Sequence, residues 1–134
     1  MPLTLADLNV LNDICDRIRS EPGVRFTGVV NKMGNLLAGG FRADIDPFVD
    51  YDKEHTMYMQ IVLDLRMRTE FDSELGKIRY VQAARDNVNM ISIPMGDHIV
   101  LLATESEVNT QRLVNLVHEE FSKQKIPKPE KILE

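Results

Sequence analysis

The segments of this chain follow one another in an order that narrows its fold more than any single residue does. Apolar periodicity and turn residues predict a helix, two strands joined by a tight turn, a long helix, three short strands and a final helix. Strands grouped between helices in this way are typical of an α+β domain, in which helices flank an antiparallel sheet.

The first part of the pattern is a capped helix followed by a hairpin. Thr4 can cap the helix with Asp7 in a weak variant of the capping box, and Pro22 stops it. The inward face of this helix carries Leu8, Leu11, Ile14, Cys15 and Ile18. Residues 24–31 and 36–38 form the two strands, and Gly34 supplies the positive φ that a tight turn requires. Alternation places Val24, Phe26, Gly28 and Val30 on one face of the first strand, and Arg25, Thr27, Val29 and Asn31 on the other.

Residues 51–75 predict one long helix that is apolar on most sides and ends at Gly76. One face, suited to cover the sheet, carries Tyr58, Ile61, Val62 and Leu65, and a second face carries Met59, Leu63 and Met67. The second face needs a cover of its own, either the first helix or a second copy of the chain. We favour the second copy, because large exposed apolar patches usually mark interfaces.

Three strands and a helix complete the pattern. The strands contain Ile78, Tyr80 and Val81, then Val88, Met90, Ile91 and Ile93, then the continuous apolar run 99–103, which is typical of a central strand. Ser106 or Asn109 caps the last helix, which turns Leu113, Val114, Val117 and Phe121 inward. Residues 1–122 are therefore predicted to form one domain, followed by a charged tail with two prolines, residues 123–134.

Composition argues against several classes of protein. The chain has 134 residues and a net charge of -5, which disfavours nucleic acid as the main partner, because a phosphate binder needs a basic face. No apolar run approaches the roughly 18 residues of a membrane span, and the N-terminus lacks the pattern of a signal peptide. The single cysteine, Cys15, cannot form an internal disulfide, so we expect a cytoplasmic protein that does not contact the membrane.

The hairpin from Val24 to Gly40 resembles the opening of roadblock domains, which read as an apolar strand, a polar turn with glycine and a second apolar strand. The order of elements resembles the wider roadblock, longin and profilin-like group, and residues 28–42 with 57–68 are similar to an uncharacterised archaeal family of about this length. The resemblance implies one five-stranded antiparallel sheet in the chain order α-β-β-α-β-β-β-α. It also implies a homodimer that pairs through the long helix and the edge strand 78–84, with Met59, Leu63, Met67, Ile78, Tyr80 and Gln82 at the interface.

No catalytic, cofactor-binding or metal-binding motif stands out, so we expect neither an enzyme nor a cofactor. The acidic residues Asp44, Asp46, Asp50, Asp52 and Glu54 lack the glycine and glutamate of an EF-hand loop. We interpret them as a solvated loop whose last carboxylates favour the start of a helix. His55, His98 and His118 have no metal-ligand spacing, and Cys15 lies on the inward face of the first helix.

One basic cluster remains in the sequence, formed by Arg66, Arg68, Arg79 and Arg85 together with Lys77. These side chains could converge where the long helix ends and the third strand begins, and there contact an anion or an acidic partner. The alternative, which we favour, is that they pair with nearby carboxylates such as Asp64.

Together these observations predict a non-enzymatic, homodimeric module that regulates or scaffolds a protein partner. A small GTPase is one candidate partner, because roadblock proteins, which this chain resembles, serve as platforms for small GTPases, motors and signalling complexes. The alternative is a small-molecule sensor, because a ligand can lie between a helix and an antiparallel sheet. The seven methionines could give such a site an adaptable apolar lining.

Overall fold

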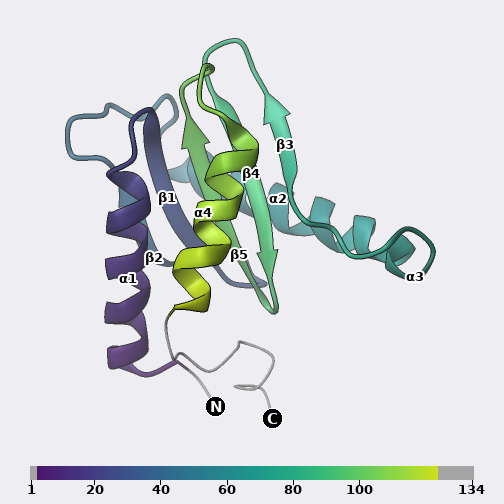
Figure 1. The fold of residues 1–134 in the computed structure, drawn as a ribbon. Helices are drawn as coiled ribbons and strands as arrows, with labels where there is room; N and C mark the ends of the chain where they lie inside the picture. The colour runs from purple at the N-terminus through teal and green to yellow at the C-terminus, as the bar shows by residue number, and fades with distance from the viewer. Residues whose placement is uncertain (1–2, 124–134) are drawn as a thin grey trace.

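Five antiparallel strands form one sheet, in the spatial order β2-β1-β5-β4-β3, with helices on both of its faces (Figure 1). The computed structural model that gives this fold describes residues 3–123. Its elements are α1 (Leu5–Arg19), β1 (Val24–Val30), β2 (Leu36–Phe41), α2 (Tyr51–Arg68), the 3-10 helix η1 (Thr69–Phe71), α3 (Asp72–Leu75), β3 (Val81–Ala84), β4 (Asn89–Met95), β5 (His98–Thr104) and α4 (Thr110–Ser122). The α+β class and the chain order α-β-β-α-β-β-β-α are thereby confirmed. Of the predicted tail, residues 124–134 lie outside the described residues.

Each face of the sheet packs against its own helices. α1 and α4 cover one face, where the core contains Leu11, Ile14, Cys15, Ile18, Val24, Val29, Ala38, Ile91, Ile93, Val100, Leu102, Leu113, Val114 and Val117. α2 covers the other, where the core contains Phe26, Val30, Tyr58, Val62, Leu65, Val88, Ile99, Leu101 and Ala103. Because β5 lies in the middle and sends alternate side chains into both cores, its apolar run is continuous.

Capping residues define where α1, α2 and α4 begin, as the sequence predicts. Thr4 and Asp7 form a capping box in which each side chain accepts a hydrogen bond from the other residue's backbone N–H, at 3.1 and 3.0 Å. Asp50 caps α2 by accepting from the Lys53 N–H at 2.9 Å. For α4 the cap is Asn109. These bonds satisfy N–H groups that have no partner inside a helix, so each helix begins at a defined residue.

The β1–β2 turn lies directly against α2. Gly34 has a φ of 77°, which confirms the positive φ predicted for the hairpin. A Cβ placed at Gly34 would lie 2.5 Å from the Met59 sulfur, so a larger residue here would displace the Met59 side chain and would also strain the backbone at this positive φ. Met59 is therefore half-buried beneath the turn.

The predicted face assignment for the start of β1 is wrong. A bulge between Val24 and Phe26, where β1 pairs with β5, reverses the alternation at that point. Val24 consequently points into the α1–α4 core with Val29, and not to the side of Phe26. Arg25 joins Phe26 in lining a pocket on the α2 side of the sheet.

The third strand is shorter than predicted, because β3 begins at Val81 and excludes Ile78 and Tyr80. Val81 lies opposite Ser92 of β4. If that register continued, Arg79 would lie opposite Pro94, which has no backbone N–H to donate. Pairing therefore stops before that position.

The long helix predicted over residues 51–75 is divided into three pieces. α2 ends at Arg68, one turn of 3-10 helix follows as η1, and α3 runs to Leu75. Gly76, with a φ of 87°, stops the helical path at the predicted residue.

Candidate functional site

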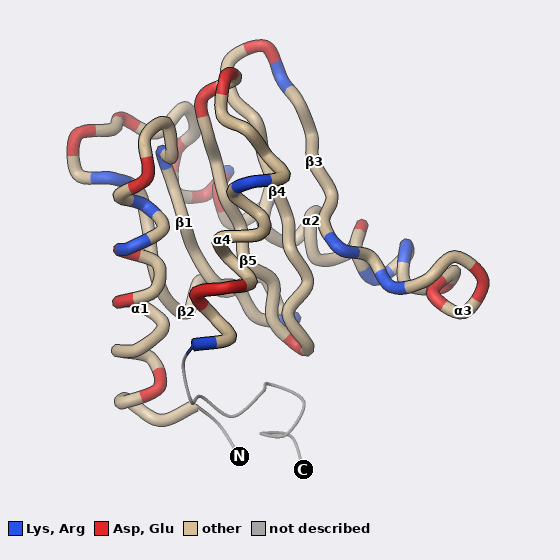
Figure 2. The backbone as a smooth tube through the Cα atoms, viewed as in Figure 1, with Lys and Arg blue, Asp and Glu red and all other residues tan. Residues whose placement is uncertain are grey.

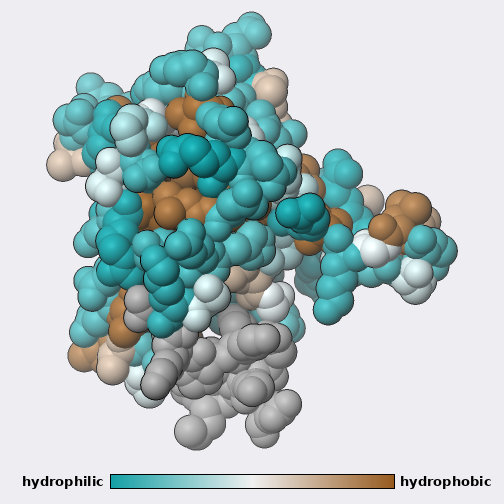
Figure 3. All heavy atoms as spheres, viewed as in Figure 1, coloured by the Kyte–Doolittle hydropathy of each residue, from teal (hydrophilic) through white to brown (hydrophobic). Residues whose placement is uncertain are grey.

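The last turn of α2, with η1 and α3, projects beyond β3 at the edge of the sheet (Figure 1). We call residues 66–76 the arm. Four large apolar residues follow one another at four-residue spacing from α2 into the arm, with exposed fractions of 51% for Leu63, 72% for Met67, 51% for Phe71 and 82% for Leu75. We call these four residues the apolar stripe. Figure 3 shows hydrophobic atoms on the projecting part of the molecule, an exposure that in a folded chain usually marks a contact surface.

The two edge strands of the sheet, β2 and β3, differ in whether other residues cover their outer backbone groups. At the β2 edge, the Gly39 N–H donates to Asn12 Oδ1 at 2.8 Å, and the Gly40 carbonyl accepts from Arg19 Nη1 at 2.9 Å. Both side chains belong to α1, so helix residues satisfy these edge groups. At the opposite edge, no strand within residues 3–123 pairs with the outer side of β3. Its exposed residues Gln82, Ala83 and Ala84 carry no charge that would discourage pairing with another strand.

The structure divides the six predicted interface residues into three groups. Leu63 and Met67 are exposed on the apolar stripe, and Gln82 is exposed on β3. Ile78 and Tyr80 are half-buried and line a groove of about 640 Å³ between the arm and the segment that leads into β3. Met59 is covered in part by the β1–β2 turn.

Phe71 and Leu75 belong to the same surface but were not among those six residues. They line the groove together with Met67, and they extend the stripe to the end of the arm. Their four-residue spacing from Leu63 is visible in the sequence, and the signal could have been read there.

The four arginines do not all meet at one place. Arg68 pairs with Asp64 at 2.9 Å, as the alternative interpretation expected, and it lines the groove with Arg79. Arg85 instead lines two other hollows under α2. Within residues 3–123, no ion pair engages Arg66, Arg79 or Arg85. Figure 2 shows basic residues gathered where α2 ends and where the chain enters β3, so the arm combines apolar and basic groups.

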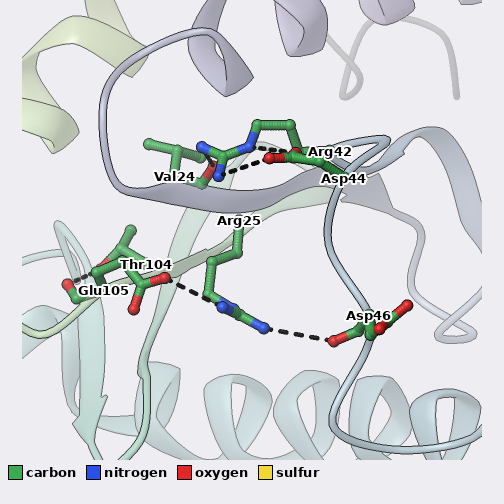
Figure 4. Close-up of polar contacts among 7 residues, drawn as sticks. All are labelled: Val24, Arg25, Arg42, Asp44, Asp46, Thr104 and Glu105. Atoms are coloured by element: carbon green, nitrogen blue, oxygen red, sulfur yellow. Dashed lines mark hydrogen bonds and ion pairs between the residues drawn. The ribbon is translucent and has the colours of Figure 1, made fainter.

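The acidic loop between β2 and α2 is held in place by two arginines (Figure 4). Arg25 Nη1 donates to Glu105 Oε1 at 3.0 Å, and its Nη2 donates to the Asp46 carbonyl at 3.4 Å. Arg42 donates to the Val24 carbonyl at 3.2 Å and to Asp44 at 2.8 Å. The Arg42 side chain lowers the pKa of Asp44 through this hydrogen bond. The bulge in β1 is what brings Arg25 to this side, a placement that sequence alternation missed.

Burial also shifts the pKa of Cys15 and of His98. Burial raises the pKa of the Cys15 thiol to about 12, so the group is a neutral part of the core. Burial lowers the pKa of His98. Within the described part of the chain, no three His, Cys, Asp or Glu side chains lie close enough to hold a metal ion, and no helix is both long and apolar enough to cross a membrane.

Comparison with solved structures shows a roadblock and profilin-like fold. The chain superposes on MglB from Myxococcus xanthus with a TM-score of 0.70 and 11% identity, covering 92% of each chain. For a roadblock/LC7 domain from Streptomyces avermitilis the TM-score is 0.66 at 11% identity, covering 84% of this chain and 92% of the other. Profilin IB from Acanthamoeba castellanii gives 0.55 at 10% identity, covering 84% of this chain and 94% of the other.

A family model matches almost the whole described domain. It is that of DUF6659, a family of unknown function, and it matches residues 5–127, so the chain belongs to this family. No curated protein matches the chain in sequence.

Proposed function

We propose that this protein is a homodimeric module that regulates or scaffolds a protein partner, and that two copies pair through the apolar stripe and the β3 edge. One observation carries the proposal. The only sheet edge without cover among the described residues lies beside the largest run of exposed apolar side chains on one helical path. An unpaired edge and an apolar helix face can both be buried by a single symmetric contact.

The contrast between the two edges supports this choice of surface. α1 already covers the β2 edge, and its Asn12 and Arg19 occupy backbone groups there. β3 offers the same kind of backbone groups without such a cover, so a second β3 can extend the sheet by antiparallel pairing. The groove beside β3, lined by Met67, Phe71 and Leu75, then lies inside the contact.

The partner is inferred from the resemblance to roadblock domains, which serve as platforms for small GTPases, motors and signalling complexes. A small GTPase is therefore the first candidate. The basic residues on and beside the arm offer charge to an acidic surface of such a partner. We assign no reaction to the chain. We place the protein in the cytoplasm, where a single reduced cysteine is ordinary.

Replacement of Leu63 by aspartate tests the proposed interface. Leu63→Asp puts a charge into an apolar contact that excludes water, and we expect the dimer dissociation constant to rise at least about 100-fold. Sedimentation equilibrium measures this constant. Leu5→Asp is the matched control, because Leu5 is exposed on α1, and α1 packs beside β1 and β2 at the other side of the sheet from β3.

Both variants should keep the wild-type circular dichroism spectrum, because both side chains are exposed in the single chain. Loss of the dimer in Leu63→Asp alone supports the interface. A Leu63→Asp variant that dimerises as tightly as Leu5→Asp contradicts it.

A further inference from the structure

A second hollow lies on the α2 side of the sheet, away from the arm. It has a volume of about 630 Å³, within the range of small-molecule sites. It is lined by the β2–α2 loop, α2, the end of β2, strands β1, β4 and β5, and the β3–β4 turn. Its apolar lining consists of Phe26, Phe41, Phe48, Val49, Met57, Tyr58, Val88, Met90 and Ala103. We call it the loop pocket.

Aromatic rings dominate one wall of the loop pocket. The Phe26 ring packs against Phe41 with centroids 4.8 Å apart, and against Tyr58 with centroids 6.1 Å apart. The Arg25 guanidinium lies over the Phe48 ring, 4.4 Å from its centroid. Phe48 nevertheless remains 60% exposed, although it faces this apolar lining. An apolar occupant can cover the Phe48 ring and remove that exposed surface from water.

The charges at the loop pocket balance one another. Arg25 is paired with Glu105 at 3.0 Å, and Arg85 and Asp86 are neighbours in the lining and bring one charge of each sign. A ligand with a net charge therefore meets no surplus of the opposite sign here. Arg85 is the lining arginine without an ion pair among the described residues, but the adjacent Asp86 offsets its charge, so an anion removed from water here would be poorly compensated.

One polar group of the loop pocket has no partner. Tyr58 is only 6% exposed as a residue, and its hydroxyl makes no hydrogen bond with any residue between 3 and 123. The hydroxyl oxygen is not among the fully buried polar atoms that lack a partner, so it stays accessible to a donor or acceptor that enters from solvent. Burial raises the pKa of this hydroxyl, so it remains a neutral donor throughout the physiological range.

We propose that the loop pocket binds an uncharged, largely aromatic small molecule that carries a hydrogen-bond acceptor, and that Tyr58 donates to that acceptor. The ring system lies against Phe26, Phe41 and Phe48, and the acceptor takes up the unused hydroxyl. The site is independent of the proposed dimer, because none of its lining residues belongs to the apolar stripe or to β3. Ligand binding is a function additional to scaffolding. An experiment can refute one of the two proposals and leave the other standing.

A matched set of naphthalene compounds tests the chemistry of the site by isothermal titration. 2-Acetonaphthone has a ring and a neutral acceptor, and 2-ethylnaphthalene lacks the acceptor. 2-Naphthoate and 2-naphthylmethylamine carry a negative and a positive charge. We expect the ketone to bind at least about threefold more tightly than the hydrocarbon, the gain typical of one hydrogen bond. Both charged compounds should bind more weakly than the ketone.

Two variants locate the binding. Tyr58→Phe removes only the hydroxyl, so the ketone should lose its advantage while the affinity for the hydrocarbon stays unchanged. Phe48→Ala should weaken both neutral ligands, whereas Phe71→Ala, which removes an equally large exposed ring from the arm, should weaken neither. The proposal is overturned if the ketone does not bind, if a charged analogue binds as tightly, or if Tyr58→Phe keeps the preference for the ketone.

Discussion

Asn12 of α1 accepts a hydrogen bond from the Gly39 N–H at 2.8 Å and so covers part of the outer edge of β2. The same amide also donates to the Leu8 carbonyl at 3.1 Å, which holds the side chain along its own helix. Asn12 thereby provides a hydrogen-bond partner at the β2 edge, whereas no strand within residues 3–123 pairs with the outer side of β3. The asymmetry leaves one side of the sheet available for pairing.

Asn12→Ala should lower the free energy of unfolding by about 1 kcal/mol, the typical net value of one hydrogen bond. Urea denaturation followed by circular dichroism measures the change. Asn9→Ala is the matched control, because Asn9 is exposed on the same helix and the two substitutions change helix propensity equally. Equal stability of the two variants would show that the Asn12–Gly39 bond does not support the edge.

Local sequence patterns predicted the features that a few neighbouring residues decide. The capping box at Thr4, the turn at Gly34 and the helix stop at Gly76 each depend on short-range backbone conformation. Contacts between distant residues decided the features that were predicted wrongly. The bulge that turns Arg25 toward the α2 side depends on the pairing of β1 with β5. The late start of β3 depends on Pro94, which lies opposite the position where Arg79 would pair.

The candidate site divides in the same way. The apolar stripe could be predicted, because its four-residue spacing is written in the sequence. Two other features depend on the strand order: α2 runs past the edge of the sheet, and β3 is the uncovered edge. Spacing within the sequence does not determine strand order.

Cys15 provides a direct test of the α1–α4 core. Its thiol is buried and burial raises its pKa to about 12, so the reactive thiolate is scarce at pH 8. We expect the native protein to react with a disulfide reagent at least about 100-fold more slowly than the protein in guanidinium chloride. The chain has one cysteine, so a single absorbance trace reports this site alone. Rapid labelling of the native protein would contradict the packing of α1.

His98 should make stability depend on pH. Burial lowers its pKa below the ordinary histidine value of 6.5, and Nδ1 has no hydrogen-bond partner among the described residues. The unfolded chain therefore binds this proton at higher pH than the folded chain, so the contribution of His98 is fully present above pH 6.5 and is lost as pH falls. Neighbouring Asp97 opposes the shift and Lys32 adds to it.

His98→Gln should flatten the dependence of the free energy of unfolding on pH between 5 and 7. Urea titrations at several pH values measure the slope. His118→Gln is the matched control for the loss of a histidine, because His118 is exposed on α4. The same slope in wild type and His98→Gln would exclude this histidine as the source.

The basic residues of the arm make a separate prediction about the partner. If Arg66 and Arg79 contact it, replacing both by alanine should abolish partner binding and change the thermal midpoint little, because both side chains are exposed. Pull-downs from nucleotide-loaded lysate, quantified by mass spectrometry, give the readout. A double Arg17→Ala and Arg112→Ala variant changes the net charge equally on the opposite face. Unaltered binding by the Arg66 and Arg79 variant would refute the contact.

Native mass spectrometry of the freshly purified protein tests the central claim most directly. The proposed pairing through the apolar stripe and the β3 edge predicts a species of twice the 15.3 kDa chain mass at micromolar concentration. That mass would show that two copies associate, and the loss of the dimer in Leu63→Asp would then place the contact on the apolar stripe. A monomer under the same conditions would contradict the homodimer and leave the stripe available only to a different partner.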